Sequence, residues 1–279
     1  MLVKMVKAAA VQVRNSGYIK NIDENFKRIE RQIENAVSQD AEILCLPEYF
    51  SVNSGMFSMD KNFLTTLDIN KENTLGFLKD ISQKYWIIIV GNVLEEIDEK
   101  YYNVAYIYEK GSLIGRQVKI HPTRGERALG ISSGREINVF KTSIGQIGVL
   151  VCADVLYPEM CRILGLMNAE IVLNPVVSFY KEIDPTKDAR RSLYISRAYD
   201  NSYYMIKAGE TGKSFTGLKI VGRSLIVAPW GILKSYTDEN KEEILIADLD
   251  MDLLREIRRE NYSLVDRIPE AYQILVKHI

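Results

Sequence analysis

Short apolar stretches alternate with amphipathic stretches along the whole chain. The apolar stretches have the length and β-branched content of buried strands, and the amphipathic ones repeat apolar residues at helical spacing. Strands are predicted at residues 5–13, 41–46, 85–91, 102–108, 113–120, 148–151, 171–173, 203–208, 222–228 and 244–248. Helices are predicted at residues 22–37, 73–84, 188–198 and 253–260, and from about residue 158. This alternation predicts the α/β class.

Composition narrows the class of protein further. The 279 residues carry 36 Lys and Arg against 37 Asp and Glu, so the net charge of −1 predicts neither a nucleic-acid partner nor an anionic membrane surface. We find no segment long and apolar enough to span a bilayer. Neither a linker nor a short repeat divides the chain, so we expect one domain over residues 1–279.

The scarcity of histidine and cysteine excludes several kinds of site. A histidine-based triad would need His121 or the penultimate His278. The three cysteines, Cys45, Cys152 and Cys161, form no C-x-x-C pair, which argues against a structural zinc site. An odd, sparse set of cysteines also fits a reducing compartment, so we expect a cytoplasmic protein without a bound metal.

Three reactive side chains each follow a predicted strand at its carboxyl end. They are Glu48, Lys119 and Cys152. In open α/β sheets this edge is where ligands bind. A carboxylate, an ammonium and a thiol together can form a nucleophilic site without histidine. Taken singly, each also has a structural explanation, as a surface charge or a small packed residue.

The strings around these residues resemble one protein family. L-P-E-Y-F at residues 46–50, R-Q-V-K-I-H at 116–121 and V-C-A-D-V-L-Y-P-E at 151–159 occur in the order seen in the nitrilase, or carbon–nitrogen hydrolase, superfamily. The opening A-x-V-Q strand, the hairpin before Cys152, the R-A-x-D-N helix at 197–201 and the G-x-S to P-x-G hairpin at 222–231 extend the resemblance over nearly the whole chain. The family's usual P-G before the nucleophile hairpin is Ser133-Gly134 here.

The resemblance implies a mechanism that needs neither a metal nor an organic cofactor. Cys152 would attack an amide carbon to form a thioester, and Glu48, with a pKa raised by burial, would act as its base. Lys119 would face the oxyanion together with the backbone N–H of Ala153, and would favour the thiolate of Cys152. Glu126 would position the substrate or hold Lys119.

The same resemblance bears on the substrate. Nitrile-cleaving members usually carry W-E where this chain has Ala153-Asp154, which favours an amide. Members that cleave N-carbamoyl amino acids place arginines where this chain has Val155 and Leu156, which favours a neutral or weakly polar amide. Arg124, Arg190 or Arg191 would be an alternative carboxylate clamp. The expected substrate-binding residues are Tyr49, Asp154, Tyr157, Val176 and Phe179.

Several alternatives to amide hydrolysis stay open at this point. They are hydrolysis of N-carbamoyl compounds or nitriles, acyl transfer from the same thioester, and a non-catalytic binding module. His121 lies close to Lys119, and we interpret it as a packing residue rather than a base. The string from Gly209 to Ser214 resembles the end of a phosphate-binding loop. That motif requires its first glycine at position 207, where this chain has Lys207.

The resemblance also predicts the architecture and assembly. The family fold is a four-layer α-β-β-α sandwich with a strand-to-helix elbow at the nucleophile. Members commonly form homodimers or larger assemblies. The R-x-P-x-x-Y string at residues 267–272 resembles a family tail that joins the subunit contact, so we expect residues of about 250–279 to contact a second subunit.

Overall fold

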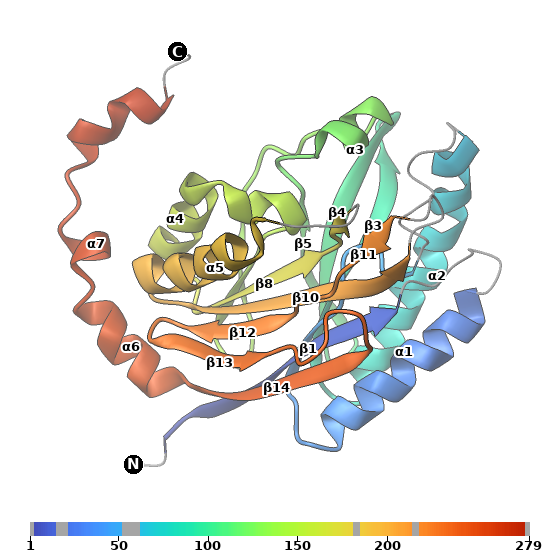
Figure 1. Ribbon diagram of the computed structural model, residues 1–279, viewed down its shortest axis with the longest axis horizontal. Coiled ribbons are helices and arrows are strands. Elements are labelled where there is room, and N and C mark those ends of the chain that lie inside the picture. Colours follow the sequence, from blue (N-terminus) through green and yellow to red (C-terminus); the bar gives the residue numbers. More distant parts are fainter. Residues whose placement is uncertain (1–2, 15–21, 52–61, 181–184, 214–217, 277–279) are drawn as a thin grey trace.

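The computed structural model describes residues 3–14, 22–51, 62–180, 185–213 and 218–276. Its strands form one continuous path whose order does not follow the chain (Figure 1). The path runs β5 (Ser112–Val118), β4 (Lys100–Glu109), β3 (Ile88–Ile97), β2 (Ile43–Cys45), β1 (Met5–Arg14), β10 (Tyr204–Lys213), β8 (Ile171–Val176), β7 (Gln146–Val149) and β6 (Val139–Lys141). Branching from it are β14 (Glu243–Asp250) on β1, β12 (Leu225–Ala228) on β10, β13 (Gly231–Ser235) on β12, and the short strands β9 (Phe179–Tyr180) and β11 (Lys219–Ile220).

Strand β1 joins two half-sheets. It pairs with β14 from Met5 to Gln12 and with β2 from Ala8 to Ala10, but with β10 only at its end, where Val13 lies opposite Glu210. The two half-sheets therefore fold over each other and bury one apolar layer between them. Side chains from both contribute to that layer, among them Ala8, Val90 and Ile107 from one half and Val149, Leu173 and Ile206 from the other.

Helices cover both outer faces (Figure 1). Helices α1 (Ile22–Val37) and α2 (Asn62–Lys84) pack on the half-sheet of β1 to β5, where Ile29 and Ile33 are fully buried. Helices α4 (Pro158–Leu166) and α5 (Lys187–Asn201) pack on the half-sheet of β6 to β10. Pro158 starts α4 because a helix needs no N–H at that position. The expected α-β-β-α sandwich is confirmed.

Several elements differ in extent from the sequence prediction. Strand β3, predicted at residues 85–91, runs from Ile88 to Ile97. Strand β8 does not end at Asn174-Pro175, because Pro175 keeps an extended backbone and pairs in register with Ala208. Strand β10 continues to Lys213, so the string from Gly209 to Lys213 is strand rather than a phosphate-binding loop, while residue 214 lies outside the described residues. Helix α2 begins at Asn62, well before the predicted start at 73.

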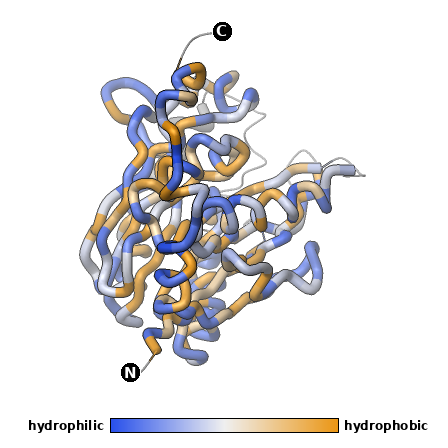
Figure 2. The backbone as a smooth tube through the Cα atoms, turned by 90° about the vertical axis from the view of Figure 1, so that its left-hand side faces the viewer, coloured by the Kyte–Doolittle hydropathy of each residue, from blue (hydrophilic) through white to orange (hydrophobic). Residues whose placement is uncertain are grey.

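The C-terminal segment follows the edge of the sandwich (Figure 1). Helix α6 (Met251–Arg259) docks by burying Met251 and Leu254. Beyond it, α7 (Tyr262–Val265) and the 3₁₀-helix η4 (Pro269–Val276) carry exposed apolar side chains, and Figure 2 shows hydrophobic and hydrophilic positions alternating there. No helix in the described part of the chain has the length and apolar character needed to cross a membrane.

Candidate active site

The fold brings Glu48, Lys119 and Cys152 together at the carboxyl ends of β2, β5 and β7. The Glu48 and Lys119 side chains are each 1% exposed, and Lys119 Nζ lies 2.8 Å from Glu48 Oε1. Burying two charges costs free energy unless they pair and their remaining hydrogen-bonding positions are filled. The surrounding contacts fill them.

Glu126 is the second partner of Lys119. Lys119 Nζ donates to its Oε1 at 2.9 Å and its Oε2 at 2.8 Å. Glu126 lies in the short helix α3 (Arg124–Ala128), which begins with a capping box: Thr123 N donates to Glu126 Oε2 at 2.7 Å, and Glu126 N donates back to Thr123 Oγ1 at 3.2 Å. The helix cap therefore fixes the carboxylate that faces the ammonium.

Asn103 of β4 connects the two carboxylates, and we did not predict it from the sequence. Its Nδ2 lies 2.8 Å from Glu48 Oε1 and 2.9 Å from Glu126 Oε1, while its Oδ1 accepts from Asn92 of β3. Tyr49 completes the network by donating its hydroxyl to Glu126 Oε1 at 2.6 Å. An asparagine within an otherwise apolar strand is the only sequence signal for this role, because a buried amide needs partners.

Cys152 lies on a strained elbow between β7 and the 3₁₀-helix η3 (Cys152–Leu156). Its φ of 48° is left-handed, which costs a side-chain-bearing residue about 1–2 kcal/mol. Buried Asn174 holds this elbow by donating to the carbonyl oxygens of Leu150 and Cys152, and its own carbonyl accepts from Tyr194 at 2.6 Å. Asn174 therefore positions the elbow that carries Cys152, and strand β8 continues past it.

The backbone of Val177 links the Cys152 thiol to the Glu48 carboxylate. The Cys152 Sγ lies 3.6 Å from the carbonyl oxygen of Val177, and the Val177 N–H donates to Glu48 Oε2 at 3.1 Å. Val177 follows β8, so the strand that carries Asn174 also sets the distance between Glu48 and Cys152. The sequence carried no signal for this backbone role.

The pKa values of the cluster follow from burial and charge. Burial raises the pKa of Glu48, and the charge of Glu126 raises it further, against the opposing effect of Lys119. Burial opposes the charge on Lys119, but Glu48, Cys152 and Glu126 outweigh it and raise its pKa, so the ammonium persists. Burial also opposes ionisation of Glu126, yet Lys119 and its hydrogen bonds lower that pKa.

The side chain of Cys152 rests as a thiol rather than a thiolate. Burial and the Glu48 charge raise the Cys152 pKa well above its ordinary value, and Lys119 lowers it by less. Lys119 therefore favours the thiolate, as expected, but burial and the Glu48 charge outweigh its effect. A thiol beside a carboxylate of raised pKa is instead arranged for proton transfer as bond formation proceeds.

Asp154 and Tyr157 brace the elbow from the other side. The buried Asp154 carboxylate accepts from the backbone N–H of Ile120 at 3.3 Å and of His121 at 2.8 Å, which ties η3 to the segment that carries Lys119. The His121 ring stacks on Tyr157 with centroids 3.5 Å apart and planes 11° apart. His121 therefore packs on Tyr157, as predicted, and its Nδ1 lies 3.0 Å from Asp154 Oδ1.

A cavity of about 360 Å³ opens beside Cys152. Val176 and Phe179 line it, as does Ala153, whereas Tyr49, Asp154 and Tyr157 are absent from its described lining because their side chains are engaged in the contacts above. The remaining wall holds Thr123, Val155, Leu156, Val177, Ser178, Tyr180, Lys187, Arg190, Arg191, Leu193, Tyr194, Lys207, Arg223, Leu225 and Tyr236. Among the described residues, no group of His, Cys, Asp and Glu side chains is arranged to hold a metal ion.

Comparison with known proteins places this geometry in a family. The carbon-nitrogen hydrolase family model matches residues 7–259. A nitrilase from Pyrococcus abyssi is 30% identical over 96% of this chain and 99% of its own length, and a deaminated glutathione amidase from Dictyostelium discoideum is 26% identical over 85% and 86%. The crystal structure of a carbon-nitrogen hydrolase from Helicobacter pylori superposes with a TM-score of 0.90 over 99% of both chains at 24% identity. The chain belongs to the carbon–nitrogen hydrolase family, the nitrilase superfamily, and is an enzyme of that family.

Proposed function

We propose that this carbon–nitrogen hydrolase cleaves small linear amides to the acid and ammonia through a thioester on Cys152. The observation that carries the proposal is the buried Glu48–Lys119–Glu126 cluster, joined through the Val177 backbone to a thiol at a cavity wall. Its amidase relative adds support for amide chemistry.

Glu48 serves as the base in the first half of the reaction. It takes the Sγ proton as the sulfur attacks the carbonyl carbon, so no free thiolate has to form beforehand. The same proton then passes from Glu48 to the leaving nitrogen as the C–N bond breaks, which releases ammonia and leaves the acyl group on sulfur. A carboxyl group with a raised pKa suits both transfers.

Lys119 stabilises the oxyanion of the tetrahedral intermediate. An ammonium has three N–H donors, and Lys119 makes three contacts with only two carboxylates. It can therefore turn one N–H towards the substrate oxygen and still hold one bond to each carboxylate. The backbone N–H of Ala153, the next residue after the nucleophile, is the second donor, and losing one such donor typically costs ~3–4 kcal/mol.

The second half of the reaction repeats these roles with water. Glu48 removes a proton from the water that attacks the thioester, and the collapse of the intermediate returns the proton to sulfur and releases the acid. Val176 and Phe179 contact the substrate from the cavity wall. We assign Tyr49, Asp154 and Tyr157 to positioning, because their polar or aromatic groups contact Glu126, the Lys119 segment and His121.

The assembly belongs to the same proposal. We propose that residues 1–279 act as one domain and that the segment of about 250–279 contacts a second copy of the chain in a homodimer or a larger assembly. Ile268, Leu275 and Val276 are 63%, 65% and 85% exposed, and such apolar surface favours burial against a partner. The three free cysteines support a reducing location, the cytoplasm.

Ammonia release from a panel of amides, nitriles and N-carbamoyl compounds tests the proposal. Wild type should release ammonia from amides, Cys152→Ala should not, and Cys161→Ala, which alters a buried thiol outside the cavity lining, should retain activity. Amide hydrolysis that survives in folded Cys152→Ala, or a wild type that cleaves nitriles alone, would reject it.

A further inference from the structure

The lining of the cavity beside Cys152 is cationic. Lys187, Arg190, Arg191, Lys207 and Arg223 line it, and no Asp or Glu is among its described lining residues. The family resemblance favoured a neutral substrate, because Val155 and Leu156 stand where members that cleave N-carbamoyl amino acids carry arginines. The fold instead brings these cations to the cavity from α5, from β10 and from the segment before β12.

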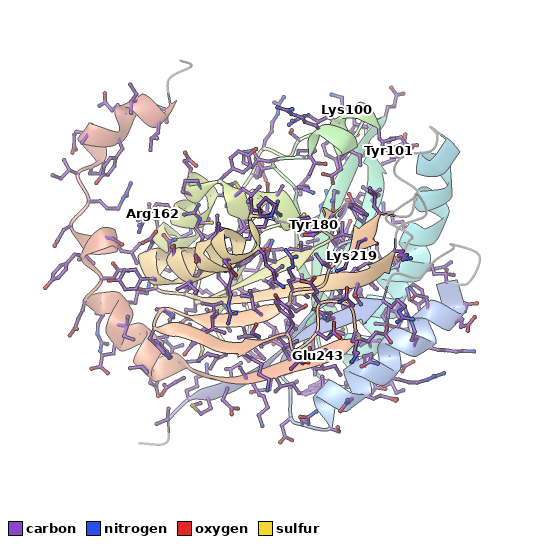
Figure 3. The ribbon with its side chains drawn as sticks, viewed as in Figure 1. Lys100, Tyr101, Arg162, Tyr180, Lys219 and Glu243 are labelled. Atoms are coloured by element: carbon purple, nitrogen blue, oxygen red, sulfur yellow. The ribbon has the colours of Figure 1, made fainter. Side chains whose placement is uncertain are left out.

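One carboxylate outside the described lining neutralises part of this charge. Glu239 lies 2.7 Å from Arg223 Nε, 3.1 Å from Lys187 Nζ and 3.1 Å from Lys219 Nζ. Burial opposes its ionisation, but these cations lower its pKa to about 2, so it stays charged. Figure 3 labels Lys219 beside Tyr180, where β11 pairs with β9 at the edge of the cavity. Glu239 therefore serves three cations, and within the described parts of the chain no carboxylate pairs with Lys207, Arg190 or Arg191.

Lys207 is the exception among these cations because it is buried. Its side chain lies on β10 with 7% of the residue exposed, and its Nζ donates to the carbonyl oxygen of Arg223 at 2.9 Å. Arg223 has a left-handed φ of 47° and so turns between the strands beside Lys207. The Tyr194 ring lies 5.5 Å from Nζ. No carboxylate of the described residues pairs with Lys207.

A buried ammonium without a counter-charge is unfavourable. Burial and the neighbouring Arg223 charge lower the Lys207 pKa to about 7. Arg190, at the same wall, bonds through its Nε to the Thr186 hydroxyl at 3.1 Å and also pairs with no described carboxylate. An anion in the cavity would supply the missing counter-charge for both residues.

We propose that the natural substrate carries a carboxylate remote from the scissile C–N bond, and that Lys207 binds this carboxylate and determines specificity. This rests on the proposed amide hydrolysis at Cys152. The amide would lie at Cys152 and Lys119, and the carboxylate at Lys207, with the exposed Arg190 and Arg191 guiding it into the cavity. Val176 and Phe179 would contact the apolar chain between the two ends.

Matched amides that differ in charge alone test this assignment. The monoamides of succinic, glutaric and adipic acid are compared with the corresponding diamides, which are nearly isosteric but neutral. Wild type should prefer a monoamide in kcat/KM by about 10- to 100-fold, the value of one charge-assisted hydrogen bond. Lys207→Met should abolish that preference through a higher KM for the monoamide, with kcat and diamide hydrolysis nearly unchanged.

Two further variants separate the role of Lys207 from a general effect of charge. Lys207→Arg should recover part of the preference, because the cation returns at the same position. Lys234→Met removes an exposed cation from β13, outside the cavity lining, and should leave the preference intact.

Binding to the unreactive Cys152→Ala variant keeps this inference distinct from the proposed reaction. Calorimetry should find that a monoamide binds more tightly than its diamide, and that Lys207→Met in the same background removes the difference. Equal turnover of monoamide and diamide by wild type would overturn the carboxylate assignment and leave amide hydrolysis intact. If the wild type turns over no amide but the monoamide still binds in a Lys207-dependent way, the proposed reaction is rejected and the anion site is retained. Equal binding of monoamide and diamide would reject the anion site.

Discussion

Replacing Glu126 by glutamine should weaken Glu48 as a base. Both carboxylates contact Lys119 Nζ at 2.8 Å, so their charges lie about 5 Å apart, and at an effective dielectric constant of about 20 their repulsion is ~3 kcal/mol. This repulsion helps to raise the Glu48 pKa. Removing it should therefore lower that pKa.

The direction of the pH effect follows from the proposed role of Glu48 as the base. The base must be ionised, so activity is lost as the pH falls through its pKa. Glu126→Gln lowers this pKa, and the acid limb of the kcat/KM profile should therefore move to lower pH. A weaker base transfers the Sγ proton less readily, so the plateau rate should also fall, by about 10-fold.

A pH profile of ammonia release for wild type and Glu126→Gln measures both effects. Glu136→Gln removes an exposed carboxylate from the same region of the chain and should leave the limb in place. An acid limb that stays fixed, or moves to higher pH, in a folded Glu126→Gln variant would refute the electrostatic coupling of Glu126 to Glu48.

Three further variants test the Glu48–Lys119–Glu126 cluster and the C-terminal segment. Asn103→Leu removes a hydrogen bond to the ionised Glu48, so the acid limb should move to higher pH, opposite to Glu126→Gln; a downward shift would contradict this. Lys119→Met leaves two carboxylates buried without a counter-charge, and urea unfolding at pH 7 should find a loss of ~3–5 kcal/mol that shrinks as acid protonates them; unchanged stability at pH 7 would count against the pairing. Val276→Glu places a charge on the exposed tail and should shift the assembly towards monomer in light scattering, whereas an unaltered dimer would remove Val276 from the contact.

Much of the fold was predictable because its signals are local. The spacing of Ile29 and Ile33 marks the buried face of α1, and Pro158 marks the start of α4. The start of α2 was missed because the mainly polar stretch at residues 68–73 interrupts the apolar repeat before the predicted start. Strand β8 passes through a proline that would ordinarily end a strand, and only pairing with β10 shows that it continues.

The candidate site was predictable where one residue carries a reactive group after a strand. Glu48, Lys119 and Cys152 are of this kind. The contacts made by Asn103 and Asn174, and the Val177 backbone link, depend on which strands become neighbours, and no local pattern encodes that. The cationic wall at Lys207 was hidden for the same reason, since its residues come from segments far apart in the chain.

Acid-quenched turnover followed by intact-protein mass spectrometry tests the central claim most directly. During hydrolysis of a good amide, wild type and Cys161→Ala should gain the mass of one acyl group, mapped to Cys152 and removed by hydroxylamine, while Cys152→Ala gains none. An acyl group mapped to any other residue, or ammonia release by Cys152→Ala without an adduct, would contradict the thioester mechanism.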